Sequence, residues 1–361
     1  MINKIIILFV LLLTLVKPAD VFAKDYYYKG EVFWIIRETE IDKELYEQEL
    51  KVRILEGELQ GQEKVIEYES PNILLKEQLY KVGDKVILME GINLDGESMF
   101  MITDRIRSNS LIILSLIYGI AIIGLAKFKG FKSLLGLGLS FLVVIKFIVP
   151  QILAGANPLL VSILGSVGIV SVTLYLTHGV KKQTTVSLIS TLLSLVLTGV
   201  IAVLVTKLTK LTGLGSEEAM FLQISQQSIA SMRGLLLGGI MIGALGVIDD
   251  ITVTQAAIVF ELKKANQKLG IKELYKRGLN IGKDHIASMT NTLVLAYTGA
   301  SLPLFLLFYS SEIIPGWVAI NSEIIVEEVV ATLVGSLGLI ASVPITTYLA
   351  AVVVCKYYFR K

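Results

Sequence analysis

Residues 184–206 read TTVSLISTLLSLVLTGVIAVLVT, a run of 23 residues without a charged side chain. As a helix this run is about 34 Å long, enough to cross the hydrocarbon core of a bilayer, which is roughly 30 Å thick. Lipid offers the backbone no hydrogen-bond partner, so a run of this kind has to be helical inside a membrane. The stretch therefore predicts an integral membrane protein.

Similar apolar runs recur through the rest of the chain. Hydrophobic residues make up 54% of its 361 residues, and the mean hydropathy is +0.71. This composition is too apolar for an ordinary soluble domain. We predict an all-α polytopic membrane bundle of about seven transmembrane helices. Their expected ranges are 110–126, 133–149, 158–177, 184–206, 234–260, 285–308 and 328–355.

The N-terminus has the features of a secretory signal peptide. An apolar run of 12 residues extends from Ile5 to Val16, which is too short to span a bilayer as a helix. Val21 and Ala23 are small or β-branched residues suited to signal-peptidase cleavage after Ala23. We predict a signal peptide at residues 1–23, with an uncleaved anchor as the alternative. Both alternatives place the segment that follows on the outer side of the membrane.

Residues 24–107 differ in composition from the helical part. They contain short strand-like runs separated by turn residues such as Gly83-Asp84. Their net charge is −7, whereas residues 108–361 carry +8. We therefore predict a small β-rich extracytoplasmic domain at 24–107, followed by a transmembrane helical domain at 108–361.

The distribution of basic residues supports this orientation. Residues 24–107 outside the membrane would put four segments in the cytoplasm, and together these hold 15 Lys and Arg residues. The segments are 127–132, 178–183, 261–284 and the tail 356–361. The outer loops offer Lys207 and Lys210. This positive-inside bias predicts a cell-membrane protein with its C-terminus in the cytoplasm.

Polar side chains gather on the fifth and sixth predicted spans. On the fifth span they fall on two adjacent helical stripes, one starting at Asp249 and one at Asp250. Ionised carboxylates in a hydrocarbon region cost several kcal/mol unless they are paired or wet. We therefore expect one inward-opening, water-filled cavity. The candidate pathway residues are Asp249, Asp250, Thr252, Thr254, Gln255, Glu261, Asp284, His285, Ser288 and Asn291.

Several chemistries fit this set of residues. The two adjacent aspartates can take up a proton or hold a cation, and His285 can relay protons near neutral pH. Oxygen ligands with one imidazole also suit a hard divalent ion, which Asp249, Asp250 and His285 would bind. Alternatively, the aspartates cap a helix break or bond to neighbouring hydroxyls. The sequence requires no cofactor.

The same region resembles a known family. The stretches Gly243–Gln255, Glu273–Gly278, Ile281–Ser288 and Asn291–Pro303 are similar to the YibE/F family of bacterial multipass membrane proteins, and the likeness extends over most of residues 110–355. The resemblance implies a permease-like protein in a bacterial membrane. It supplies no catalytic or substrate-binding residues.

We expect a permease or transporter for a cation or a proton-coupled small solute. One alternative is an intramembrane enzyme that uses acid/base or metal chemistry, and another is an envelope sensor or assembly partner. The chain lacks P-loop, nucleophile-elbow and His-Glu-x-x-His motifs. It also lacks a basic patch with interleaved aromatic residues for nucleic acid. Cys355 is the only cysteine, which excludes an intrachain disulfide. The bilayer is the one expected partner besides an ion or solute.

Overall fold

The computed structural model describes residues 27–43, 45–68, 74–92, 98–226, 228–310 and 315–358. The predicted signal peptide lies outside these residues. The chain forms two compact units, which divide between Ala121 and Ile122. Each unit is considered by itself.

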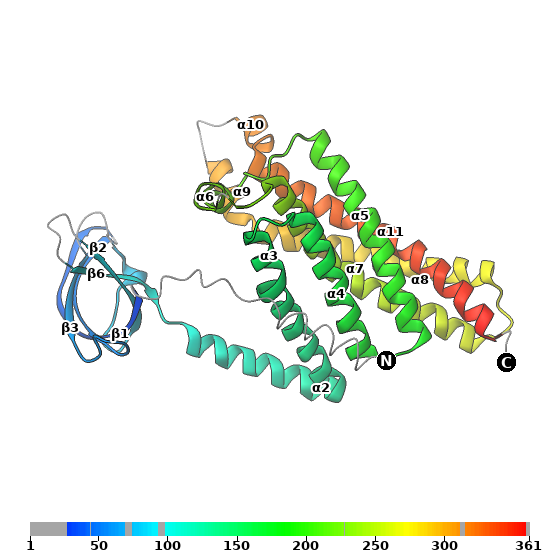
Figure 1. The fold of residues 1–361 in the computed structure, drawn as a ribbon, viewed down its shortest axis with the longest axis horizontal. Helices are drawn as coiled ribbons and strands as arrows, with labels where there is room; N and C mark the ends of the chain where they lie inside the picture. The colour runs from blue at the N-terminus through cyan, green and yellow to red at the C-terminus, as the bar shows by residue number, and fades with distance from the viewer. Residues whose placement is uncertain are drawn as a thin grey trace. The chain divides into compact units, whose positions relative to one another are not determined.

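The first unit is built on an antiparallel sheet (Figure 1). Its strands are β1 (Tyr27–Asp42), β2 (Leu45–Ile54), β3 (Glu63–Tyr68), β4 (Leu74–Leu75), β5 (Lys85–Ile92) and β6 (Ser98–Arg105). Their order is β3-β2-β1-β5-β6, and β4 pairs with β2. Alternate residues such as Val32, Leu50 and Leu88 point inward and are fully buried, as the period of two in a strand requires. The predicted β-rich domain is confirmed.

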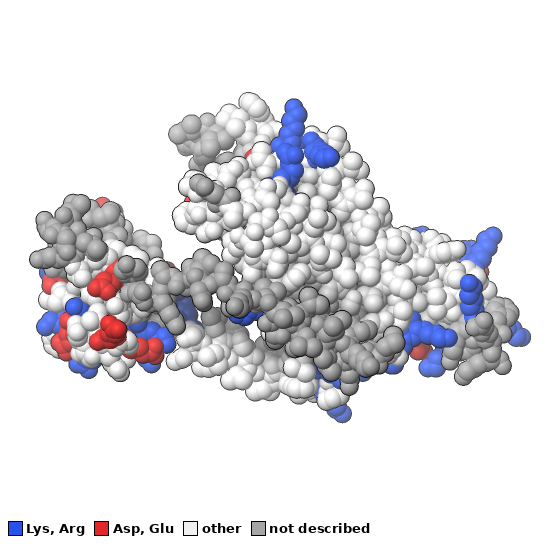
Figure 2. Space-filling view, in the orientation of Figure 1, with Lys and Arg blue, Asp and Glu red and all other residues white. Residues whose placement is uncertain are grey.

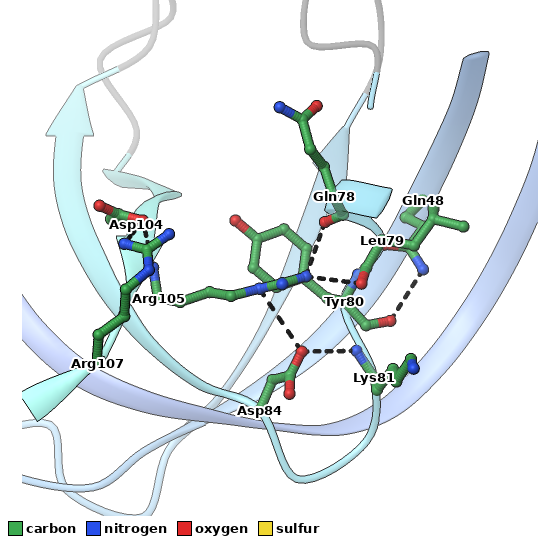
Figure 3. A network of polar contacts seen from close by, with 9 residues as sticks. All are labelled: Gln48, Gln78, Leu79, Tyr80, Lys81, Asp84, Asp104, Arg105 and Arg107. Carbon is green, nitrogen blue, oxygen red and sulfur yellow. Dashed lines mark hydrogen bonds and ion pairs between the residues drawn. The ribbon is translucent and has the colours of Figure 1, made fainter. Parts of the chain in front are cut away.

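A polar network fastens the loop before β5 to this sheet (Figure 3). The buried amide of Gln48 donates from Nε2 to the Tyr80 carbonyl at 3.1 Å and accepts from the Tyr80 backbone N–H at 2.9 Å. Arg105 donates to the carbonyl oxygens of Gln78 and Leu79 at 2.8 and 2.7 Å. The two Gln48 bonds satisfy buried polar groups, so the network serves the fold of the sheet.

The second unit is helical, and its first helix begins in the first unit. The helices are α2 (Ser108–Val143), a π-helical segment η2 (Val144–Ile148), α3 (Val149–Leu153), α4 (Pro158–His178), α5 (Lys182–Leu208), α6 (Glu217–Ser225), α7 (Met232–Ala265), α8 (Ile271–Ala300), α9 (Leu302–Ser310), α10 (Gly316–Ile320) and α11 (Glu323–Tyr358). Within the described residues, five helical segments are long and apolar enough to cross a membrane, and the bent pair of α8 and α9 makes up to six. The chain is a multipass membrane protein.

The surface of the helical unit agrees with this assignment. In Figure 2, Lys and Arg lie at the ends of that unit, while its flank is almost free of charged side chains in this view. Large apolar residues such as Leu125, Val196 and Leu306 are exposed on its helices. An apolar belt between charged ends is the surface that a bilayer requires.

Two breaks shape the helices. Lys127 has φ 51° and ψ −130°, which interrupts the helix between the predicted spans 110–126 and 133–149. The axes of α8 and α9 meet at 60°. Pro303 lies at this bend, where its ring removes a backbone donor and prevents a regular helix. The first break thus lies next to the end of the predicted span 110–126, and the second lies at a proline.

Helix α7 occupies the centre of the bundle, packed against α4, α5, α8 and α11. On one side it meets a group of buried polar side chains, which we call the hydroxyl seam. The seam consists of Ser187, Thr191 and Thr198 of α5, Thr252 and Gln255 of α7, and Thr347 of α11, each at most 1% exposed. The other side of α7 borders a cavity.

Candidate functional site

A cavity of about 910 Å³ lies between α2, α4, α7 and α8. We call it the α7 cavity, because α7 contributes both of its carboxylates, Asp249 and Asp250. Asp249 lies on one helical stripe of α7 that borders the cavity. Ile242, Gly246 and Val253 lie on that stripe and also line the cavity.

The two carboxylates differ in their surroundings. Asp249 is half-buried, and its Oδ1 atom is buried without a hydrogen-bond partner. Asp250 is exposed to the cavity, and its backbone carbonyl accepts a hydrogen bond from Thr254 Oγ1 at 3.0 Å. A buried carboxylate oxygen without a partner is costly, so Asp249 is the group most in need of a proton, a cation or water.

The other walls add imidazoles and hydroxyls. His285 and Ser288 come from α8, and His178 is the last residue of α4. The sequence contains two histidines, and both line the α7 cavity. Of the predicted pathway residues, the structure thus brings together five at the cavity. They are Asp249, Asp250, Thr254, His285 and Ser288.

Sequence reasoning missed several cavity residues. The sequence assigns residue 178 to the cytoplasmic segment 178–183, because the predicted span ends at residue 177, whereas α4 includes residue 178. Thr173 and Thr177 of α4 also line the cavity, and their spacing of four residues is the signal that marks one helix face. Ser133 and Ser140 of α2 are seven apart and lie on the opposite wall by the same rule.

Two predicted residues lie in the hydroxyl seam instead. Thr252 Oγ1 is 2.7 Å from Thr191 Oγ1 and donates to the Asp249 carbonyl at 2.9 Å. Gln255 Nε2 donates to the Gly278 carbonyl at 2.8 Å and to Thr347 Oγ1 at 2.7 Å. Both side chains are fully buried, so here they hold helices together.

Three more predicted residues are exposed and do not line the α7 cavity. These are Glu261, Asp284 and Asn291. Glu261 lies 3.5 Å from Lys264 Nζ on the same helix. Such an exposed pair contributes little to stability. Asp284 and Asn291 lie on α8, which contributes to the cavity, but their own side chains do not line it.

The side chains do not assemble a metal centre of the expected kind. Among the described residues, no three His, Cys, Asp or Glu side chains are close enough together to hold a metal ion. The set of Asp249, Asp250 and His285 proposed from the sequence therefore does not form a ligand sphere in this structure. What remains is a roomy cavity with two carboxylates, two imidazoles and several hydroxyls, suited to holding a cation or moving a proton.

Comparisons with known proteins add the family. A family model described as YibE/F-like protein matches residues 114–356. This range contains all the residues that line the cavity. The same comparisons found no curated protein and no solved structure that matches the chain.

Proposed function

We propose that this chain, which belongs to the YibE/F-like protein family, is a permease that moves a cation or a proton-coupled small solute through the α7 cavity. One observation carries the proposal: two carboxylates of a membrane-spanning helix border a cavity of about 910 Å³. Ionisable groups within a membrane helix are costly and mark ion pathways or proton relays more often than packing.

The topology that supports transport has seven spans. Five helical segments qualify directly, and in this proposal the bent α8–α9 pair is taken as one further span. The first of the five covers residues 108–153, and the break at Lys127 divides it into two pieces, each long enough to span. With basic loops inside, residues 24–107 lie outside a bacterial cell membrane, and the C-terminus lies in the cytoplasm.

Each cavity group has a distinct role in this proposal. Asp249 binds the cation or proton, since its Oδ1 has no other partner. Asp250 sits beside it and raises the local negative potential. His285 and His178 exchange protons with water at the cytoplasmic side, because a neutral imidazole has one nitrogen that donates a proton and one that accepts. The hydroxyls of Thr254 and Ser288 supply neutral oxygen ligands.

Reconstitution into proteoliposomes tests the proposal. Flux of K⁺, Mn²⁺ and benzyltrimethylammonium is followed with an internal pH dye and by tracer uptake. We expect at least one solute to move, and the double variant Asp249→Asn with Asp250→Asn to lose that flux by about tenfold or more. Glu261→Gln, an exposed acid on the same helix, is the matched control and should transport normally.

Flux that is unchanged by the double aspartate variant contradicts the proposal. A second candidate is an intramembrane acid/base enzyme, which is favoured by both histidines lining the cavity that holds both aspartates. An enzyme needs its acid and base within one hydrogen bond or one water of a shared substrate position. Substrate turnover by detergent-solubilised protein that depends on His285 and Asp249, without flux in vesicles, would favour this candidate instead.

A further inference from the structure

The size and lining of the α7 cavity narrow the class of solute. Resting on the proposed function, we infer that the cavity takes an organic cation with an apolar body, and not a bare metal ion. Cavity volume, charge and wall composition each support this assignment, and one glycine of α7 provides a direct steric test.

The volume of the cavity fits an organic molecule. It measures about 910 Å³, within the range of roughly 300–1,000 Å³ that is common for small-molecule pockets. A water molecule occupies roughly 30 Å³ in the liquid. A bare or partly hydrated ion would leave most of the α7 cavity unfilled, whereas an organic cation can contact several walls at once.

The charge of the lining selects for cations. Asp249 and Asp250 both line the cavity, and none of the described residues that line it is Lys or Arg. The buried Oδ1 of Asp249 has no hydrogen-bond partner within the described structure. An ammonium group beside either carboxylate would compensate its charge, whereas an anionic solute would meet uncompensated negative charge.

Apolar side chains lie beside the hydroxyls on the α2 and α4 walls of the cavity. Leu137 and Phe141 of α2 and Val144 of η2 line the cavity, as do Ile169 and Leu174 of α4. Phe141 supplies an aromatic ring among the residues that line the cavity. Aromatic faces attract organic cations, and aliphatic side chains favour an apolar body.

The carboxylates alone make a poor site for a metal ion. Hard divalent ions need about six oxygen ligands in a compact shell. No three His, Cys, Asp or Glu side chains gather for this purpose among the residues that the structure describes. One or two carboxylates beside an apolar wall suit a diffuse ammonium charge better, because that charge needs no compact shell of ligands.

Gly246 provides the steric test. It lies on the cavity stripe of α7, and a Cβ atom added there meets no heavy atom within 4 Å. Gly246→Phe therefore places a ring in the cavity without a clash in the backbone. Gly239 lies seven residues away on the same helix, is also exposed and also has open space at its Cβ, but does not line the cavity. Gly239→Phe is the matched control.

The assay measures binding of tritiated tetraphenylphosphonium to the purified full-length chain in detergent by scintillation proximity. We expect saturable binding, with competition by benzyltrimethylammonium. The neutral triphenylphosphine oxide, benzenesulfonate and Mn²⁺ should not compete. Asp249→Asn should weaken binding roughly tenfold to a hundredfold. Gly246→Phe should abolish it, and Gly239→Phe and Glu261→Gln should bind as the unaltered chain does.

The outcomes separate this inference from the proposed function. Absence of saturable tetraphenylphosphonium binding to the unaltered chain overturns the inference, as does displacement by Mn²⁺ with equal potency. Equal binding by Gly246→Phe and Gly239→Phe, each confirmed as folded by size-exclusion chromatography, also overturns it. Aspartate-dependent Mn²⁺ or K⁺ flux would still support a permease in these cases. Specific binding without flux would uphold the organic-cation site and contradict transport.

Discussion

The two sides of α7 carry polar residues at similar spacing but meet different environments. On the cavity side, Asp249 and Asp250 border open space, and Asp249 Oδ1 has no partner. On the seam side, Thr252 and Gln255 are fully buried and bonded to α5, α8 and α11, although Gln255 Oε1 has no partner. Polar residues in a membrane helix therefore divide into those that bind neighbouring helices and those left for water or a ligand.

The seam is held together locally as well as between helices. Thr347 Oγ1 donates to the Val343 carbonyl at 2.6 Å, and Thr198 Oγ1 donates to the Ser194 carbonyl at 2.7 Å. A hydroxyl that bonds the carbonyl four residues earlier is satisfied inside its own helix. These side chains thus give close packing without requiring water, unlike the carboxylates of the cavity.

Gln255→Ala should cause the largest loss of stability. The variant removes two hydrogen bonds of 2.8 and 2.7 Å and leaves a cavity between α7, α8 and α11. We expect the free energy of unfolding, measured by titration with dodecyl sulfate in mixed micelles, to fall by about 2–4 kcal/mol. Thr254→Ala on the cavity side should change it by less than about 0.5 kcal/mol. Equal losses for the two variants would erase the distinction between the sides.

Gly338→Ala should have the next largest effect. A Cβ atom at Gly338 of α11 would clash with Thr198 Oγ1 and lie 3.1 Å from Ile248 Cδ1. Overpacking of this kind costs about 1–3 kcal/mol. Gly246→Ala faces open space and should be neutral or slightly stabilising, since alanine favours helix. A tolerated Gly338→Ala would show that the packing at this point of the bundle is loose.

The hydrogen bond between Thr191 and Thr252 should contribute the smallest measurable effect. Their hydroxyl oxygens are 2.7 Å apart. A double-mutant cycle with Thr191→Val and Thr252→Val should give a coupling energy of about 0.6 kcal/mol, which is typical of such bonds in membranes. The cavity-side pair Thr254→Val and Ser288→Val should show no coupling. An equally large coupling energy for the cavity-side pair would mean that direct contacts close the cavity.

The sequence predicts the helices well because apolar length is a strong signal. The predicted span 158–177 corresponds to α4, Pro158–His178, and the span 184–206 lies within α5. The predicted span ends one residue before α4 does, and that residue is His178. His178 therefore lies on α4 and lines the cavity, and it does not belong to a loop. A boundary that matters little for the fold can therefore matter for the site.

The candidate site was only partly predictable from spacing. A step of three residues turns a helix backward by about 60°, because one turn holds about 3.6 residues. Asp249, Thr252 and Gln255 therefore drift around α7, from the cavity to the seam, although their spacing suggests one stripe. Only the positions of α5 and α11 reveal where that drift leaves the cavity, and no single-helix pattern encodes those positions.

Thiol accessibility at two threonines of α7 tests the central claim most directly. Cys355, the only cysteine, is replaced by alanine, and Thr254→Cys or Thr252→Cys is introduced in that background. Inside-out vesicles are treated with a membrane-impermeant methanethiosulfonate reagent that carries a quaternary ammonium. The account predicts rapid modification at position 254 on the cavity side and none at position 252 in the seam. Equal reactivity at the two positions, whether both react or both stay protected, would contradict it.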